Sequence, residues 1–397
     1  MNRTARVAFV LLLAGCSHGL PNTTPLPVSP SLATRLAPAV AVLDSAIRAG
    51  AAPGAVLAVS IRGERFVYGT GRLGLDDATR PDGRTLYDMA SLTKVITLTT
   101  LTMMAVDDGR LDLDAPVVQY LPDFARGSGN KTAVRVRDLL LHDSGLPPGR
   151  PLWLETIVRA GGILRTVTTD LSAPPGTRMV YSDLGAITLT AILEQLYGER
   201  IDRLFATRVT KPLGLTRMRY LPPTGWLPQI APTERDPWRG RVLRGEVHDE
   251  NTARLGGVSG HAGLFSSAED LLRFGEWTLA GVLGKAPAIG PTPPKAFPIW
   301  TRRQEQPAGS SRGLGWDTPS GVSSAGTIMS ARSYGHTGFT GTSIWVDPDR
   351  EIVIVLLTNR VHPTRITPAF GLIRAVVADA VMRSAFPGVV PRGSTPP

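Results

Sequence analysis

Two apolar strand pairs at opposite ends of the chain constrain its fold most. Residues 54–71 contain two short apolar stretches separated by Gly-Glu, and residues 342–357 contain two more separated by Asp-Pro-Asp-Arg. Turn-forming residues between short apolar stretches are typical of β-hairpins. We therefore expect one antiparallel hairpin near each end of the chain.

Apolar residues recur at helical spacing through most of the stretch between the two hairpins. We predict an α+β fold (an α/β sandwich) in which the chain ends form one antiparallel sheet flanked by helices. Residues 98–310 are expected to form an inserted, mostly helical lobe, and residues 221–250, rich in proline, arginine and tryptophan, a long loop or lid. A cleft between sheet and lobe would be a suitable place for an active site. The expected helices span residues 32–50, 91–108, 134–142, 182–197, 201–213, 269–279 and 367–382.

The first residues have the pattern of an export signal. Arg3 and Arg6 precede the apolar run of residues 7–13, which is too short to cross a membrane and fits a secretory signal peptide. The Leu-Ala-Gly-Cys sequence ending at Cys16 resembles the bacterial lipobox. We therefore expect a lipoprotein anchored through Cys16 on the periplasmic side of the cell envelope. The alternative is ordinary cleavage nearby, which would release a soluble periplasmic protein. The expected organisation is a signal peptide (1–16), a flexible tether (17–31), one domain (32–384) and a tail (385–397).

Composition limits the class of partner. The net charge of +10 comes mostly from arginine, which favours an anionic polymer or a membrane surface. The arginines are scattered and form no basic block, so nucleic-acid binding is not expected. Cys16 is the only cysteine, which excludes an intrachain disulfide.

Ser91-Leu-Thr-Lys94 is the strongest chemical signal in the sequence. Residues three apart on a helix share a face, so the Ser91 hydroxyl and the Lys94 amine can come within hydrogen-bond reach. A serine hydroxyl needs a neighbouring base to become a nucleophile, and a buried lysine with a lowered pKa can be that base. The alternative is a chance match on a surface helix. Only five of the 43 basic residues are lysines, which makes this placement informative.

Two further motifs follow in the chain. Tyr181-Ser-Asp183 lies at the start of a predicted helix, and a tyrosine beside a lysine can serve as general acid or base. The alternative is that Tyr181 packs or caps and that Asp183 is a helix-start acid. His336-Thr337-Gly338 opens a glycine-rich segment that leads into the second hairpin. Small residues there would let a substrate lie along a strand edge, and a free backbone N–H would complete an oxyanion hole with that of Ser91.

These three motifs, in this order and at these separations, resemble the active-site motifs of the serine β-lactamase/penicillin-binding-protein superfamily. The chain is most similar to its class C β-lactamase-like and esterase-like branch. Residues 139–146, 313–316 and 335–341 also fit, and the resemblance extends over residues 36–382.

The resemblance implies a β-lactamase/transpeptidase-like fold and a role for each motif. Ser91 would attack a carbonyl and form an acyl-enzyme, and Lys94 and Tyr181 would move the protons. The backbone N–H groups of Ser91 and Phe339 would hold the oxyanion. Asp183, His336, Thr337 and Gly338 would contact the substrate. Neither a metal nor an organic cofactor is implied.

Two departures from the family pattern bear on the substrate. Asp183 stands where the family usually has asparagine, and His336 stands where β-lactamases and peptidases usually have a lysine that faces a substrate carboxylate. A histidine is only partly charged near neutral pH. We therefore expect a cell-envelope hydrolase of esters or amides, such as those of peptidoglycan fragments, in preference to a β-lactamase or D-alanyl-D-alanine carboxypeptidase. A lipoprotein that binds peptidoglycan without turnover is the alternative from another class.

A stretch that begins at residue 247 adds a second clue. Residues 247–251 and 256–266 resemble the branch that contains muropeptide amidases, which cleave between N-acetylmuramic acid and L-alanine. Four residues in this stretch have side chains that bind metals, but their spacing fits no zinc pattern, so we expect them to line the cleft or fix a loop. They are His248, Asp249, Glu250 and His261.

Ser311 is a competing nucleophile. Residues 309–313 match G-x-S-x-G, the pattern of the α/β-hydrolase nucleophile elbow. That elbow requires a strand before the serine and a helix after it. The flanking sequence here is polar loop and glycine-rich, so we interpret Ser311 as a chance match.

Overall fold

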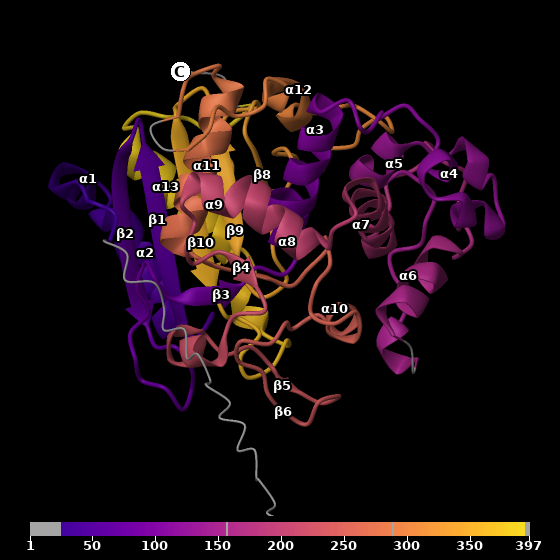
Figure 1. Ribbon diagram of the computed structural model, residues 1–397. Coiled ribbons are helices and arrows are strands. Elements are labelled where there is room, and N and C mark those ends of the chain that lie inside the picture. The colour runs from indigo at the N-terminus through magenta and orange to yellow at the C-terminus, as the bar shows by residue number, and fades with distance from the viewer. Residues whose placement is uncertain (1–24, 156–157, 288–289, 394–397) are drawn as a thin grey trace, which may run out of the picture.

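The computed structural model describes residues 25–155, 158–287 and 290–393 (Figure 1). The predicted signal peptide, Cys16 and the first part of the tether lie outside the described residues. A five-stranded antiparallel sheet, in the order β2-β1-β10-β9-β8, forms the centre of the fold. The strands are β1 (Gly54–Ile61), β2 (Glu64–Gly71), β8 (Tyr334–Thr337), β9 (Ser343–Asp347) and β10 (Ile352–Thr358).

The two predicted hairpins meet in this sheet. Strand β1 of the first hairpin pairs with β10 of the second, from Ala55 opposite Thr358 to Ile61 opposite Ile352. The ends of the chain therefore build one sheet, and the predicted α+β fold is confirmed. Strand β8 lies at one edge, beside the helices of the middle of the chain (Figure 1).

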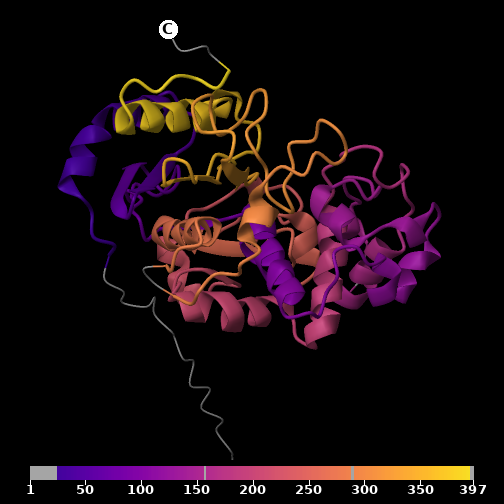
Figure 2. The ribbon, with the colours of Figure 1, turned by 90° about the horizontal axis from the view of Figure 1, so that it is seen from above.

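Each sheet face is covered by helices, because alternate residues of the central strands are buried on opposite sides. Val56 and Ala58 belong to one hydrophobic core, and Leu57 and Val59 to the other. Helix α11 (Ala268–Val282) covers the first face. The second is covered by α1 (Pro30–Arg35), α2 (Ala37–Arg48) and α13 (Ile373–Ala385), which run together along one side of the molecule (Figure 2).

The middle of the chain forms the second half of the body. The predicted helix of residues 91–108 consists of a π-helical segment, η1 (Lys94–Thr99), that continues into α3 (Thr100–Asp107). The other helices are α4 (Val117–Tyr120), α5 (Val136–Leu141), α6 (Arg159–Val167), α7 (Asp183–Tyr197), α8 (Ile201–Phe205), η5 (Ala206–Thr210), α9 (Lys211–Leu213), α10 (Glu250–Arg254) and α12 (Phe297–Thr301). The short 3₁₀ turns are η2 (Pro122–Arg126), η3 (Lys131–Ala133), η4 (Leu152–Leu154), η6 (Thr224–Gln229) and η7 (Pro368–Phe370).

Two small sheets accompany the main sheet in the described residues. Strand β7 (Leu264–Ser267) pairs with β3 (Leu86–Asp88) and β4 (Arg219–Tyr220), and β5 (Arg235–Asp236) pairs with β6 (Arg241–Val242). Residues 98–310, predicted to be a helical lobe, thus also contain short strands and α11, which packs on the main sheet. The predicted loop of residues 221–250 contains β5, β6 and η6, and is braced by the buried Asp236 carboxylate, which pairs with Arg239.

Two boundaries differ from the sequence prediction. The predicted helix of residues 32–50 is divided at Leu36, because Pro38 lacks an N–H and suits only the first turn of a new helix. The later part of the predicted tether is docked on the body: Leu26 is buried, and the Ser29 N–H donates to the Arg65 carbonyl oxygen at 2.9 Å. None of the helices in the described ranges has the length and apolar character needed to span a bilayer.

Candidate active site

Ser91 lies where β3 turns into the η1–α3 helix. The turn places Ala90 at φ 45°, a left-handed conformation that is strained for a residue with a side chain. The buried Asp88 carboxylate fixes this turn, because its Oδ1 accepts a hydrogen bond from the Ala90 N–H at 2.8 Å. One helical turn later, Lys94 Nζ donates to Ser91 Oγ at 3.0 Å. The structure therefore brings the two residues together as their spacing predicts.

Lys94 is buried, and three oxygen atoms lie close to its Nζ. Besides Ser91 Oγ, Nζ lies 2.7 Å from Asp183 Oδ1 and donates to the His261 carbonyl oxygen at 3.2 Å. Burial by itself would lower the pKa of Lys94, but the Asp183 carboxylate and Tyr181 outweigh it and raise the pKa above its ordinary value. Lys94 is thus an ammonium at neutral pH, so the lowered pKa under which the sequence analysis allowed Lys94 to act as the base is not found.

The start of α7 positions Tyr181 and Asp183. Ser182 caps this helix, since its Oγ accepts from the Gly185 N–H at 3.2 Å, and Asp183 is the first helical residue. The Tyr181 ring lies 4.9 Å from Lys94 Nζ and packs against His142, with 4.5 Å between ring centroids. The Tyr181 hydroxyl is buried and has no hydrogen bond of ordinary geometry within the described part of the chain.

Strand β8 brings His336 to the same place. His336 Nδ1 lies 2.8 Å from the Thr337 carbonyl oxygen, which can only accept, so Nδ1 carries the proton and Nε2 presents a lone pair. Burial, with the positive charges of Arg312 and Lys94, holds the pKa of His336 well below its ordinary value. His336 is therefore neutral near pH 7, and the partial charge considered from the sequence is absent.

The turn after β8 packs closely on the Ser91 segment. A Cβ at Gly338 would lie 2.3 Å from the Met89 carbonyl oxygen, so only glycine fits there. Within residues 25–155, 158–287 and 290–393, the backbone N–H groups of Ser91 and Phe339 donate to no protein acceptor. Both N–H groups are therefore available to a ligand, as the oxyanion prediction requires.

Two cavities meet at Ser91, Tyr181 and Phe339. One, of about 280 Å³, extends past Asp183 toward α10 and is also lined by His248, Asp249, Glu250, His261 and Arg365. The other, of about 300 Å³, extends along β8 and is also lined by Arg312, Asp317, His336 and Thr337. A bound substrate can thus extend to either side of the Ser91 hydroxyl.

The four side chains considered as metal ligands are engaged with separate partners. His261 lies 2.9 Å from Asp249, His248 lies 2.9 Å from Glu234, and Glu250 pairs with Arg365 at 2.7 Å. No group of three or more metal-binding side chains occurs in the portion of the chain that the structure describes. These residues line the cavity and fix its wall.

Ser311, the serine of the G-x-S-x-G match, does not lie in a nucleophile elbow. Ser311 Oγ donates to Asp317 Oδ1 at 2.7 Å, and no strand–turn–helix surrounds it. Its neighbour Arg312 points into the cavity of Ser91, a placement that the sequence analysis missed. The sequence contained a signal for this placement, because Arg312 directly precedes residues 313–316, which resemble the family.

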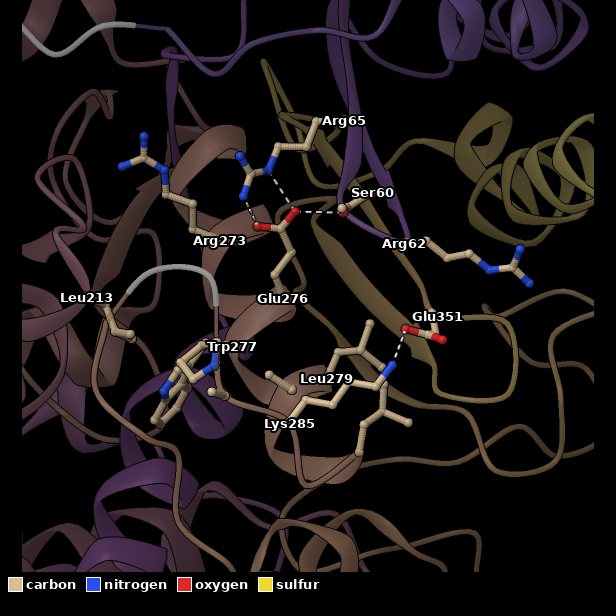
Figure 3. Close-up of a pocket in the computed structure, with 15 residues that line it drawn as sticks. Ser60, Arg62, Arg65, Leu213, Arg273, Glu276, Trp277, Leu279, Lys285 and Glu351 are labelled. Carbon is tan, nitrogen blue, oxygen red and sulfur yellow. Dashed lines mark hydrogen bonds and ion pairs between the residues drawn. The ribbon is translucent and has the colours of Figure 1, made fainter.

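A further cavity of about 160 Å³ lies between α11 and the β1–β2 hairpin (Figure 3). Four of its charged groups form two pairs, Glu276 with Arg65 and Lys285 with Glu351 at 2.8 Å, and Glu276 also accepts from the Ser60 hydroxyl. Ser91 does not line this cavity, so the candidate site is the pair of cavities that meet at Ser91, called the double cavity below.

Comparisons with known proteins agree with this geometry. An "N-acetylmuramyl-L-alanine amidase" of Bacillus subtilis is 34% identical over 362 residues, 80% of this chain and 79% of the relative. A "Putative D-alanyl-D-alanine carboxypeptidase" of Escherichia coli is 33% identical over 307 residues, 70% of each chain.

Solved structures show the same fold. A penicillin-binding protein homologue from Caulobacter crescentus superposes with a TM-score of 0.71 at 20% identity, over 90% of this chain and 99% of the other. The hydrolase EstCE1, which has promiscuous acyltransferase activity, superposes with a TM-score of 0.69 at 23% identity, over 88% and 98%. The family model described as Beta-lactamase matches residues 41–378. The chain therefore belongs to the β-lactamase family and is a serine hydrolase of that fold.

Proposed function

We propose that this hydrolase cleaves an amide or ester of a peptidoglycan fragment, in the manner of an N-acetylmuramyl-L-alanine amidase, through an acyl-enzyme on Ser91. The observation that carries the proposal is the continuous chain of contacts from Ser91 Oγ to Lys94 Nζ at 3.0 Å and on to Asp183 Oδ1 at 2.7 Å. It links a hydroxyl that lines both cavities to a charged pair that can take its proton.

The charge state of Lys94 sets the order of proton transfers. An ammonium cannot accept a proton, so Lys94 must pass one to Asp183 as the Ser91 hydroxyl turns its own proton toward Nζ. Ser91 Oγ then forms a bond to the substrate carbonyl carbon, and the C=O π pair moves to the oxygen. When the C–N or C–O bond breaks, the proton held by Asp183 returns through Lys94 to the leaving group, with Tyr181 as the relay, and the Lys94–Asp183 pair is restored. A water molecule then attacks the acyl-enzyme along the same proton path, which releases the carboxylic acid and regenerates Ser91.

The developing oxyanion is stabilised by the two free N–H groups of Ser91 and Phe339. Such donors act where charge forms, and losing one typically costs about 10²–10³-fold in rate. Ser91 also lies at the start of the η1–α3 helix, whose dipole favours negative charge.

The names of the relatives support a peptidoglycan-derived substrate, and the state of His336 bears on which bond is cleaved. The relatives at 33–34% identity carry the names of a muropeptide amidase and a carboxypeptidase. The neutral, buried His336 does not supply the charge that β-lactamases and peptidases usually place there, which favours the amidase over the carboxypeptidase or β-lactamase.

The test combines covalent labelling with product analysis. A fluorophosphonate should label the wild-type protein and the Ser311→Ala variant, and should not label Ser91→Ala. Labelling that survives Ser91→Ala but disappears in Ser311→Ala would overturn the nucleophile.

Incubation with N-acetylmuramyl peptides, followed by mass spectrometry, identifies the bond that breaks. Release of a peptide that begins with L-alanine supports the amidase, whereas loss of a terminal D-alanine supports the carboxypeptidase. Ligand binding with neither labelling nor turnover would indicate an idle binding protein.

A further inference from the structure

The cavity between α11 and the β1–β2 hairpin, called the α11 cavity below, is not used by the proposed reaction (Figure 3). One stripe of α11 and its C-terminal cap lines it, because side chains three or four positions apart share a helix face. Along this stripe the side chains change from charged to apolar. In chain order they are Arg273, Glu276, Trp277, Ala280 and Leu283.

Arg273 has donors that the protein does not satisfy. Its Nε is buried without a hydrogen-bond partner, and its Nη1 makes one long contact, 3.5 Å from the Gly214 carbonyl oxygen. Within residues 25–155, 158–287 and 290–393, Arg273 forms no ion pair, because the acids near it on α11 are engaged elsewhere. These acids are Glu269, which accepts from the Leu26 N–H, Asp270, which accepts from the Arg217 N–H, and Glu276, which pairs with Arg65.

Positive charge is in excess around the α11 cavity. Four cationic side chains and two carboxylates line it, and each carboxylate already has a cationic partner. An added anion would therefore be attracted to this cavity, and an added cation would be repelled. The cationic side chains are Arg62, Arg65, Arg273 and Lys285, and the carboxylates are Glu276 and Glu351.

The apolar part of the cavity has room for a short hydrocarbon chain. Trp277 is buried there together with Leu213 and Leu279. An apolar cavity of about 150 Å³ can hold a benzene-sized molecule, so the volume of about 160 Å³ suits about six carbon atoms. Burial of such carbons would favour binding. The cavity thus fits an anion that carries a hydrocarbon chain better than it fits a small inorganic anion.

The first described residues dock beside this cavity. The Leu26 N–H donates to Glu269 at 3.4 Å, one helical turn before Arg273, and the Ser29 N–H donates to the Arg65 carbonyl oxygen. Cys16, the expected site of the lipid anchor, precedes Leu26 by ten residues, which span at most about 35 Å. The lipids of an anchoring membrane would therefore lie close to this face of the body.

We propose that the α11 cavity binds an anionic phospholipid of that membrane, with the phosphate on Arg273 and the first carbons of one acyl chain against Trp277 and Leu283. A guanidinium presents parallel N–H donors that match two oxygens of a phosphate. The bound lipid holds the α11 side of the body toward the membrane. This inference goes beyond the proposed function, because the α11 cavity is separate from the double cavity that contains Ser91.

Calorimetric titration tests the site on the full chain carrying Cys16→Ser, which has no acyl chain of its own at that position. The probes are dihexanoylphosphatidylglycerol, dihexanoylphosphatidylcholine and inorganic phosphate, with both lipids kept below their micelle concentrations. Only phosphatidylglycerol combines a net negative headgroup with acyl carbons, so we expect it to bind at least about 10-fold more tightly than the other two. Equal affinity for the two lipids, or phosphate that binds as tightly as phosphatidylglycerol, would refute the proposal.

Two variants separate the charged part of the cavity from the apolar part. Arg273→Gln should weaken phosphatidylglycerol binding by about 10-fold to 100-fold, the range for a lost charge-assisted hydrogen bond, and change phosphatidylcholine binding by less than about 3-fold. Ala280→Phe keeps every charge and fills the apolar part, so it should abolish phosphatidylglycerol binding, with urea denaturation as the check on folding. Phosphatidylglycerol binding that is unchanged in either variant would overturn the site.

Arg383→Gln is the matched control, because it removes an exposed arginine from α13, on the opposite face of the main sheet. It should leave the affinity for phosphatidylglycerol unchanged. A loss equal to that of Arg273→Gln would mean that net charge alone governs binding and would refute the cavity.

The lipid site and the proposed function fail independently. Ser91→Ala should bind phosphatidylglycerol like its parent, and Arg273→Gln should hydrolyse p-nitrophenyl esters at the parental rate. A protein that binds the lipid without any turnover supports the lipid site and contradicts the proposed function. Turnover without phosphatidylglycerol binding refutes the lipid site alone.

Discussion

Replacing Asp183 by asparagine tests the proton path most directly. The change removes a carboxylate oxygen 2.7 Å from Lys94 Nζ and keeps the size of the side chain. At an effective dielectric constant of about 20, two unit charges at this distance attract by about 6 kcal/mol. The Asp183 side chain is 32% exposed, and solvent screening leaves about 2–3 kcal/mol of this attraction. We therefore expect the pKa of Lys94 to fall by about two pH units, at about 1.4 kcal/mol for each.

This shift predicts both the stability and the rate of the variant. The wild-type pKa of Lys94 is raised above its ordinary value, so the pair stabilises the fold fully at neutral pH and is lost only as the pH rises through the folded-state pKa. Asp183→Asn should lower the free energy of unfolding at neutral pH by about 2–3 kcal/mol. Its acylation rate should fall near pH 7 and recover toward alkaline pH, because Lys94 then loses its proton to solvent and becomes the base.

The assay is the rate of p-nitrophenyl ester turnover between about pH 6 and 10, with urea denaturation of the same samples. Asp123→Asn is the control, since it makes the same substitution in an exposed ion pair with Arg126 and should change stability by at most about 1 kcal/mol. An Asp183→Asn enzyme with the wild-type rate and the wild-type pH profile would refute the assignment of Asp183 to the proton path.

Two further predictions concern other parts of the chain. Burial beside Asp138 raises the pKa of Asp143 to about 6, so this carboxyl favours the folded state at low pH and that contribution is lost as the pH rises from about 4 through 6. Asp143→Asn should therefore raise the free energy of unfolding by about 1–2 kcal/mol at neutral pH and by little at about pH 4. Urea denaturation at these two pH values measures the change. An equal change at both pH values would contradict the argument. For the export signal, we propose that Cys16 carries the lipid anchor. Cells grown with labelled palmitate should then yield a labelled wild-type protein and an unlabelled Cys16→Ser variant. Label on both proteins would contradict lipidation at Cys16.

Local sequence patterns were sufficient for the parts of the fold that depend on neighbouring residues. The two hairpins follow from turn residues between apolar stretches, and the approach of Lys94 to Ser91 follows from the helical repeat. The docking of α11 on the main sheet did not follow from these patterns, although α11 lies inside the stretch predicted as an inserted, mostly helical lobe. Its apolar stripe is compatible with any apolar surface, and only the assembled sheet provides the partner.

The sequence alone determined that a serine and a lysine share a helix face and that three motifs follow in the family order. The tertiary structure decided how these groups are charged. Lys94 is an ammonium because Asp183, 89 positions away, lies 2.7 Å from it, and His336 is neutral because burial and Arg312 disfavour its charge. A pKa depends on burial and on charges brought together from distant segments, and neither quantity is encoded in the local pattern. For the same reason, only the folded chain showed Arg312 without a partner beside the nucleophile.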